Sequence, residues 1–272
     1  MDKHMQSRSH EFGIKKITET IANNSEAVVF DGDRTVWKGN AMEHGICMQY
    51  ILRELRRGHL PTAAYGINGY FQVKRMARER HSAKDSVDLL GEVYSRLSSV
   101  GLGNREEMQD MAFRYIRRNM TRPVRYIMLG IDGRKPYFLA TCNGSSVAAA
   151  AENIIHPVAT VSNIDIFGDD GMIKGVKVLM RHGEDKVRET HDMLSRHGIR
   201  FSKCAYIGDS EDDIPAMLQS GLSIASPFAC NKVREIADFV MWDTMTVSAD
   251  LRLGSLYPQS AGLHARILSW PG

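Results

Sequence analysis

The chain has 272 residues, a formal net charge of +3 and 25% charged residues. This length suits one large domain or two, and the nearly balanced charge gives no reason to expect nucleic-acid binding. The four cysteines are scattered and form no CxxC pair, which predicts reduced thiols in a cytoplasmic protein. The sequence shows no signal-peptide core and no apolar stretch of membrane-spanning length, so no membrane association is expected.

The first elements along the chain are a predicted short helix over about residues 10–24 and an apolar run over residues 27–30. The run is too short for a helix and contains β-branched residues, which predicts a buried strand. It ends in Asp31-Gly32-Asp33, which places two carboxylates two positions apart. Asp-Gly is a common turn pair, but ligands also bind where parallel strands end. Alone, this stretch fits either a turn or a functional site.

The segment from about residue 40 to residue 119 has helical periodicity and no clear strand. Glycine-containing breaks follow residues 57 and 100 and divide it into successive helices. The predicted helices cover residues 42–57, 61–80, 83–97 and 105–118.

From about residue 123 the pattern alternates between strands and helices. Such alternation predicts an α/β fold, a doubly wound Rossmann-like parallel sheet with helices on both faces. Two of the runs, 158–167 and 172–179, are joined by a turn-rich linker of hairpin type. The other predicted strands cover residues 137–141, 204–207, 222–225 and 239–242, and the helices cover 145–153, 183–197, 214–219 and 231–237. Residues 251–256 and 263–268 are expected to pack as a final helix.

Polar residues suited to phosphate chemistry follow three of these strands. They are Asp31 with Asp33, Thr141, and Asp209 with Asp213, while the start of a later helix supplies Lys186. The ends of parallel strands lie along one edge of the sheet, so these side chains are expected to meet there. Several carboxylates at one edge need a compensating cation, and hard oxygen ligands suit Mg²⁺.

The order and spacing of these elements resemble the haloacid dehalogenase superfamily, and most closely its phosphoserine-phosphatase-like branch with a helical C1-type cap. The family's DxDx[TV] motif corresponds to DGDRT at Asp31, and its strand ending in Thr or Ser to FLAT at Thr141. Its helix lysine corresponds to Lys186, and its GDxxxD motif to GDSEDD at Asp209 and Asp213. The resemblance covers roughly residues 26–40 and 123–243.

The resemblance implies a role for each matching residue. Asp31 would be the nucleophile that forms an aspartyl-phosphate, and Asp33 the general acid and base. Mg²⁺ would be held by Asp31, by the backbone carbonyl of Asp33 and by Asp209. Asp213 would orient Lys186 or a metal-bound water from behind the first ligands. The phosphate would be bound by Thr141, Asn143, Gly144 and Lys186.

The resemblance also implies two domains. Residues 1–39 and 120–272 would form the catalytic core, and residues 40–119 a helical cap that closes over it. The sequence departs from phosphoserine phosphatase beside the first motif, where Asn40 replaces a substrate-binding glutamate nine residues after the nucleophile. The leaving group is therefore left open, with Arg34, Trp37 and Glu43 as candidate contacts.

The expected function is hydrolysis of a phosphomonoester of a small metabolite with Mg²⁺ as cofactor. Two alternatives remain open from the residues alone. A phosphotransferase would move the phosphoryl group to an acceptor other than water. A phospho-receiver or binding module would gather similar acids, a threonine and a lysine around Mg²⁺ without turnover, although a second acid such as Asp33 serves turnover rather than storage.

Overall fold

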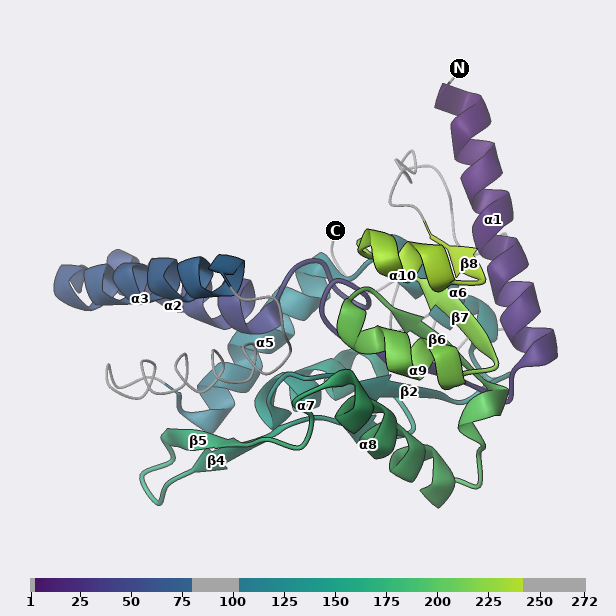
Figure 1. Ribbon diagram of the computed structural model, residues 1–272. Coiled ribbons are helices and arrows are strands. Elements are labelled where there is room, and N and C mark those ends of the chain that lie inside the picture. Colours follow the sequence, from purple (N-terminus) through teal and green to yellow (C-terminus); the bar gives the residue numbers. More distant parts are fainter. Residues whose placement is uncertain (1–2, 80–102, 242–272) are drawn as a thin grey trace.

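A computed structural model describes residues 3–79 and 103–241 and shows a parallel sheet flanked by helices (Figure 1). The six strands follow the order β3-β2-β1-β6-β7-β8, and each neighbouring pair is parallel. The predicted doubly wound α/β fold is therefore confirmed. The strands of this sheet are β1 (Ala27–Asp31), β2 (Tyr137–Ala140), β3 (Thr160–Val161), β6 (Cys204–Gly208), β7 (Leu222–Ala225) and β8 (Phe239–Val240).

Alternate residues of each strand enter different hydrophobic clusters on the two faces of the sheet. In β1, Val28 and Phe30 belong to one cluster, and Ala27 and Val29 belong to the other. Side chains from α1 (Lys3–Asn24), α6 (Arg122–Ile131) and α7 (Ser145–Ile155) complete the first cluster. Those of α8 (Gly183–Arg196), α9 (Ile214–Gln219) and α10 (Asn231–Ile236) complete the second. Burial on both faces explains why β1 reads as a continuous apolar run rather than an alternating one.

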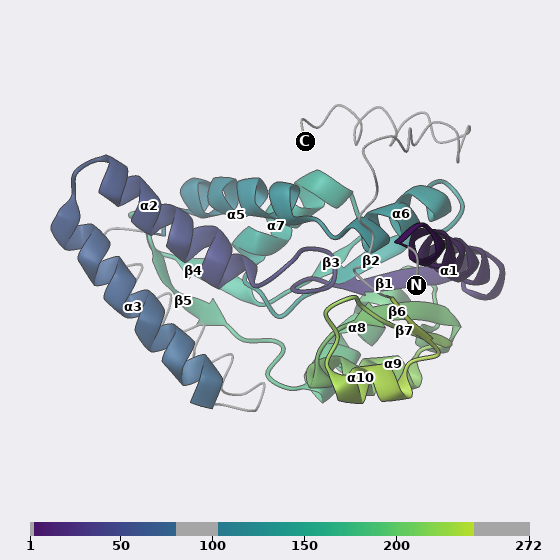
Figure 2. The same cartoon turned by 90° about the horizontal axis from the view of Figure 1, so that it is seen from above.

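The segment after β1 is helical, as predicted, but its first helix is divided. A π-helical segment, η1 (Ala41–Cys47), precedes α2 (Met48–Arg56), and α3 (Leu60–Glu79) returns alongside α2. These two helices extend to one side of the sheet (Figure 2). The predicted helix over residues 83–97 lies outside the described residues.

The last helix of this segment, α5 (Arg105–Asn119), packs against α7 of the α/β unit. Its buried residues Met108, Met111 and Ile116 belong to the same cluster as Phe30 of β1. The helical segment and the sheet thus share apolar packing. The division into a core and a cap over residues 40–119 stays a prediction.

The chain enters and leaves the helical segment through two paired linkers. The Lys38 N–H donates to the Asn119 carbonyl, and the Thr121 N–H donates to the Val36 carbonyl, both at 2.8 Å. The Thr121 hydroxyl adds a 2.6 Å bond to the Thr35 carbonyl. The two linkers that join the sheet to the helical segment are therefore bonded to each other.

The prediction of a single strand over residues 158–167 is wrong. Its first part, β3, belongs to the large sheet, whereas β4 (Ile164–Phe167) pairs with β5 (Ile173–Lys177) in a separate antiparallel hairpin. The buried Asn163 lies at the change of partner, where its N–H donates to the Asn143 carbonyl. Hydrophobic periodicity measures burial and not the identity of the neighbouring strand, so it cannot reveal this change. The predicted hairpin linker itself is confirmed.

The other predicted boundaries agree to within a few residues, except that α1 begins at Lys3 rather than near residue 10. The sequence did not predict helix α6. Two short 3₁₀ segments, η2 (Phe201–Lys203) and η3 (Glu211–Asp213), flank β6. The expected helix over residues 251–256 and 263–268 lies outside the described residues. Among the described residues, none of the helices combines the length and apolarity needed to cross a membrane.

Candidate active site

Three neighbouring strands bring the predicted residues to one edge of the sheet. β1 lies between β2 and β6, with Asp31 paired to Ala140 and Phe30 paired to Ile207. Asp31 ends β1, while Thr141 and Asp209 come directly after β2 and β6. All three side chains are buried. Strand register thus brings Asp31 to a common edge with two residues that lie more than a hundred positions later in the chain.

Lys186 lies at the centre of this group. It comes from the first turn of α8, and its side chain is buried. Its ammonium donates 2.6 Å hydrogen bonds to Asp31 Oδ1 and to Asp213 Oδ1. Burial alone would lower the pKa of Lys186, but the two carboxylates outweigh it and raise that pKa well above the usual value. The lysine is therefore held in its charged form.

Asp213 is the most completely bonded of the acids. Its Oδ1 also accepts from the Tyr206 hydroxyl at 2.9 Å, and its Oδ2 accepts from the backbone N–H groups of Asp209 and Ser210 and from the Ser210 hydroxyl. Burial would raise the pKa of Asp213, yet Lys186 and these N–H donors outweigh burial and lower it. Asp213 is thus an ionised carboxylate that anchors Lys186 and the start of the loop after β6.

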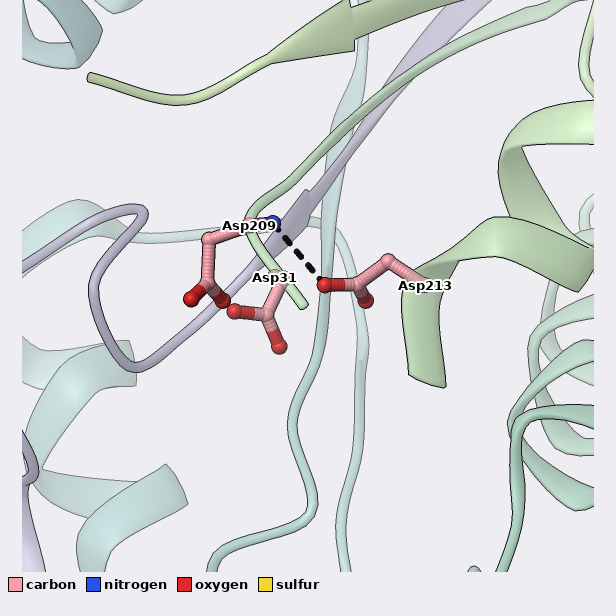
Figure 3. Close-up of side chains that lie close together, drawn as sticks. All are labelled: Asp31, Asp209 and Asp213. Atoms are coloured by element: carbon pink, nitrogen blue, oxygen red, sulfur yellow. Dashed lines mark hydrogen bonds between the residues drawn. The ribbon is translucent and has the colours of Figure 1, made fainter. Parts of the chain in front are cut away.

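Asp31, Asp209 and Asp213 form a buried carboxylate cluster (Figure 3). One oxygen from each lies within 4.8 Å of the others. Burial raises the pKa of Asp31 from 3.8 to about 7, even though Lys186 acts in the opposite direction. Burial and the charge of Asp31 also raise the pKa of Asp209 well above its usual value. Ionisation of all three acids would set three negative charges against one lysine, so a bound cation would favour their ionised forms.

The donor set fits a hard divalent cation. Asp209 Oδ2 is buried and, among the described residues, has no hydrogen-bond partner, although Arg34 Nε lies 3.4 Å away. Asp213 has both oxygens occupied by hydrogen-bond donors, which leaves Asp31 and Asp209 as the carboxylates with coordination capacity. Carboxylate oxygens together with backbone carbonyls and water are the ligands that Mg²⁺ takes in proteins.

The loop after β2 leads into α7. Thr141 Oγ1 accepts a 3.0 Å hydrogen bond from the Asn143 side-chain amide, and both residues are buried. Gly144 stands at the N-cap position of α7, and helix N-termini favour anions; the Ser146 N–H there already donates to Asp165 Oδ2 at 2.7 Å. Asp31, Asp209, Thr141 and Lys186 are therefore gathered at one place, with Asn143 bonded to Thr141.

Asp33 and Trp37 form a separate contact beside the cluster. Asp33 Oδ1 accepts a 2.5 Å hydrogen bond from the Trp37 indole N–H and a 3.0 Å bond from the Ala41 backbone N–H. Trp37 is completely buried. A Cβ added at Gly32 would meet both the Trp37 ring and Thr141 Oγ1 at 2.7 Å, so only glycine fits between them. Trp37, a candidate leaving-group contact from the sequence, is instead packed against the first motif.

Of the two other candidate leaving-group contacts, Arg34 is half exposed and has a left-handed backbone with φ 56°. Its guanidinium donates to the Phe228 carbonyl at 2.5 Å, which ties the first motif to the loop after β7. Glu43 lies in η1, and its side chain is outside the described part of the structure.

Two contributors to the site escaped sequence reasoning. They are Tyr206, which bonds Asp213, and the loop around Phe228, which bonds Arg34. Strand alternation could have identified Tyr206, because it shares a face of β6 with the cluster that packs on α8. Nothing in the local sequence marks Phe228, because its contribution is a backbone carbonyl.

Part of the chain is similar in sequence to a known family. Residues 171–246 match the sequence model of the haloacid dehalogenase-like hydrolases. No curated protein matches the chain.

Solved structures extend the likeness beyond that segment. A phospho-aspartyl intermediate analogue of phosphoserine phosphatase is 17% identical, with a TM-score of 0.58 over 80% of this chain and 94% of that one. A substrate-bound phosphoserine phosphatase complex is 16% identical, with a TM-score of 0.58 over 80% and 92%. A protein of unknown function from Bordetella pertussis Tohama I is 17% identical, with a TM-score of 0.58 over 80% and 99%. At these identities the likeness concerns the fold.

Proposed function

We propose that the chain is a haloacid dehalogenase-like hydrolase that acts as a Mg²⁺-dependent phosphatase, because residues 171–246 match that family's model and the fold resembles solved phosphoserine phosphatases. Its substrate would be a phosphomonoester of a small metabolite, hydrolysed through an aspartyl-phosphate intermediate. One observation carries the proposal: Asp31 ends β1, is buried, is bonded to Lys186 and lies in one carboxylate cluster with Asp209. The solved phospho-aspartyl analogue of a similar fold supports this assignment.

Asp31 is the nucleophile in this proposal. Its carboxylate attacks phosphorus, the bond from phosphorus to the alcohol oxygen breaks, and an acyl phosphate forms on Asp31. Water then attacks phosphorus and releases inorganic phosphate and the free carboxylate. Lys186 and Thr141 donate to the phosphoryl oxygens, and Asn143 and Gly144 complete the phosphate site. Asp213 keeps Lys186 charged and in place through their 2.6 Å contact.

Asp31, the backbone carbonyl of Asp33 and Asp209 would hold Mg²⁺. The bound cation would reduce the repulsion between the anionic nucleophile and the anionic phosphate. Asp33 would give a proton to the leaving alkoxide and later accept one from the attacking water. Its position two residues after Asp31 keeps it close to the reacting atoms.

The helical segment over residues 40–119 would act as the cap. A cap that closes over the strand edge excludes water and selects the leaving group. The paired linkers at residues 36–38 and 119–121 join the two points where the chain enters and leaves it. Asn40 stands at the position of the family's substrate glutamate, so selectivity for phosphoserine itself is not proposed.

The experiment is phosphate release from an aryl phosphate and from a set of phosphorylated metabolites, with Mg²⁺ or with chelator. Asp31→Asn is expected to abolish release while the circular dichroism spectrum stays unchanged. Asp192→Asn, an exposed acid on α8, is the matched control and should keep wild-type rates.

Three outcomes separate the candidate functions. Full activity in Asp31→Asn contradicts the nucleophile assignment. A product that carries the phosphoryl group on an added alcohol identifies a phosphotransferase. A phosphorylated Asp31 that persists without phosphate release identifies a receiver-like module instead of an enzyme.

A further inference from the structure

The strongest unexplained contact near the site is the one between Trp37 and Asp33. Trp37 is completely buried, and its indole N–H lies 2.5 Å from Asp33 Oδ1. A buried indole N–H needs an acceptor, but a backbone carbonyl would serve that need equally well. The acceptor here is the carboxylate two residues after the predicted nucleophile.

The backbone of Trp37 is fixed from two directions. It forms a β-bridge with Met120 in the paired linkers, and its own N–H bonds to the Gly32 carbonyl at 3.3 Å. The six-membered part of its ring lies directly against Gly32. The indole therefore has little freedom to rotate, so its N–H points at one place.

We propose that Trp37 is a positioning residue that holds the Asp33 carboxylate in place for proton transfer to the leaving group. The proposal rests on the proposed phosphatase function and goes beyond it by adding a residue that touches no substrate. Ala41 supplies the second donor to the same oxygen, at 3.0 Å. Because Ala41 begins the helical segment, the same oxygen also links Asp33 to the start of the segment proposed as the cap.

A positioning role for Trp37 and a purely packing role predict different effects on substrates with good and poor leaving groups. A general acid matters most when the leaving group is a poor one, because an alkoxide must be protonated whereas a nitrophenolate leaves unaided. Loss of a positioning contact to Asp33 should therefore slow alkyl phosphates more than aryl phosphates. Loss of packing alone should slow both by the same factor.

Two substitutions of Trp37 separate the N–H donor from the bulk of the ring. Trp37→Phe keeps a six-membered ring and removes the donor. Trp37→His loses bulk, yet its Nε2 occupies the place relative to Cβ that the indole nitrogen holds. The assay compares kcat/KM for benzyl phosphate and p-nitrophenyl phosphate at about pH 8, where an ordinary histidine is neutral.

The expected result is a fall of roughly tenfold or more in the benzyl to nitrophenyl ratio for Trp37→Phe, carried by kcat. Trp37→His should restore most of that ratio. Phe30→Leu, which truncates a buried aromatic of β1, is the control and should leave the ratio unchanged. Equal losses on both substrates in Trp37→Phe would overturn the proposal.

Two further experiments apply if Trp37→Phe does not fold or if the protein has no phosphatase activity. If Trp37→Phe does not fold, benzothienylalanine at position 37 replaces the N–H by sulfur with nearly the same shape, and the same ratio decides. If the wild-type protein releases phosphate from neither ester and from none of the metabolites, the proposed function fails, and the contact is tested separately by NMR. The indole ¹⁵N–H resonance that disappears in Trp37→Phe should move in Asp33→Asn; an unmoved resonance would refute the positioning role.

Discussion

Lys186 Nζ lies 2.6 Å from Asp31 Oδ1, and the two residues are 155 positions apart in the sequence. The contact joins α8 to the end of the central strand, and Asp213 holds the same ammonium from the other side. Removal of any one of these three buried charges would leave another without its partner in a low-dielectric environment, which is costly. The site is therefore also a structural element of the fold.

Removal of the Lys186 charge should destabilise the protein. Lys186→Met leaves the carboxylates of Asp31 and Asp213 buried without their cation, and loss of one partner of a buried pair costs about 3–5 kcal/mol. Urea unfolding at pH 8 in chelator measures the change. Lys232→Met removes an exposed lysine paired with Glu211 and should leave the unfolding midpoint unchanged. Equal midpoints for the two variants would show that the buried ammonium has no structural role.

Asp31 should make the metal-free protein less stable as pH rises. Its pKa is about 7 in the folded protein and near 3.8 when unfolded, so between these values the folded state binds the extra proton. Stability therefore falls as pH increases from about 4 through 7, by at most roughly 4 kcal/mol at about 1.4 kcal/mol per pKa unit.

Asp31→Asn removes this titration. As the pH rises from 5 to 8, the free energy of unfolding of the wild type should fall relative to that of the variant. Urea unfolding of both proteins in the presence of chelator measures this difference. A difference between the two proteins that does not change with pH would show that Asp31 titrates normally in the folded state.

Arg34 should weaken the binding of a divalent cation. Its Nε lies 3.4 Å from Asp209 Oδ2, a buried oxygen for which residues 3–79 and 103–241 supply no hydrogen-bond donor. A cation bound at that oxygen would be repelled by the half-exposed guanidinium, with an effect limited by solvent to about 1 kcal/mol or less. Isothermal titration with Mg²⁺ at low salt should show up to about fivefold tighter binding to Arg34→Gln, and little change in Arg34→Lys. Tighter binding to both variants would point to the loss of the bond to Phe228 instead.

Gly32 should tolerate no side chain. A Cβ at this position would lie 2.7 Å from Thr141 Oγ1 and 2.7 Å from the Trp37 ring. Gly32→Ala should cost about 1–3 kcal/mol, which is typical of overpacking a buried site, and should reduce phosphatase activity because both neighbours are displaced. Thermal unfolding and the aryl phosphate assay test this.

Gly175→Ala is the matched control for that substitution. Gly175 lies in β5, and a Cβ there would meet nothing within 4 Å. The control should keep both the wild-type melting temperature and the wild-type rate. If Gly32→Ala behaves like Gly175→Ala, the close approach of Thr141 and Trp37 to the backbone is not a constraint.

The sequence by itself determined the fold class and the set of residues that meet. Short apolar runs such as 27–30 predict buried strands, and the ends of parallel strands always lie along one edge. That rule brings Asp31, Thr141 and Asp209 together without any knowledge of side-chain positions. The helix at 214–219 and the strand at 222–225 were placed at their observed bounds for the same local reasons.

Only the tertiary structure decided how those residues are bonded. Local patterns report burial, whereas hydrogen-bond partners depend on which side chains reach each other across elements. The sequence could not show that Tyr206 and Lys186 share one oxygen of Asp213, or that Trp37 turns its N–H toward Asp33. The exchange of partners between β3 and β4 was hidden for the same physical reason: a strand carries its own hydrophobic pattern, but its neighbour is chosen by the rest of the fold.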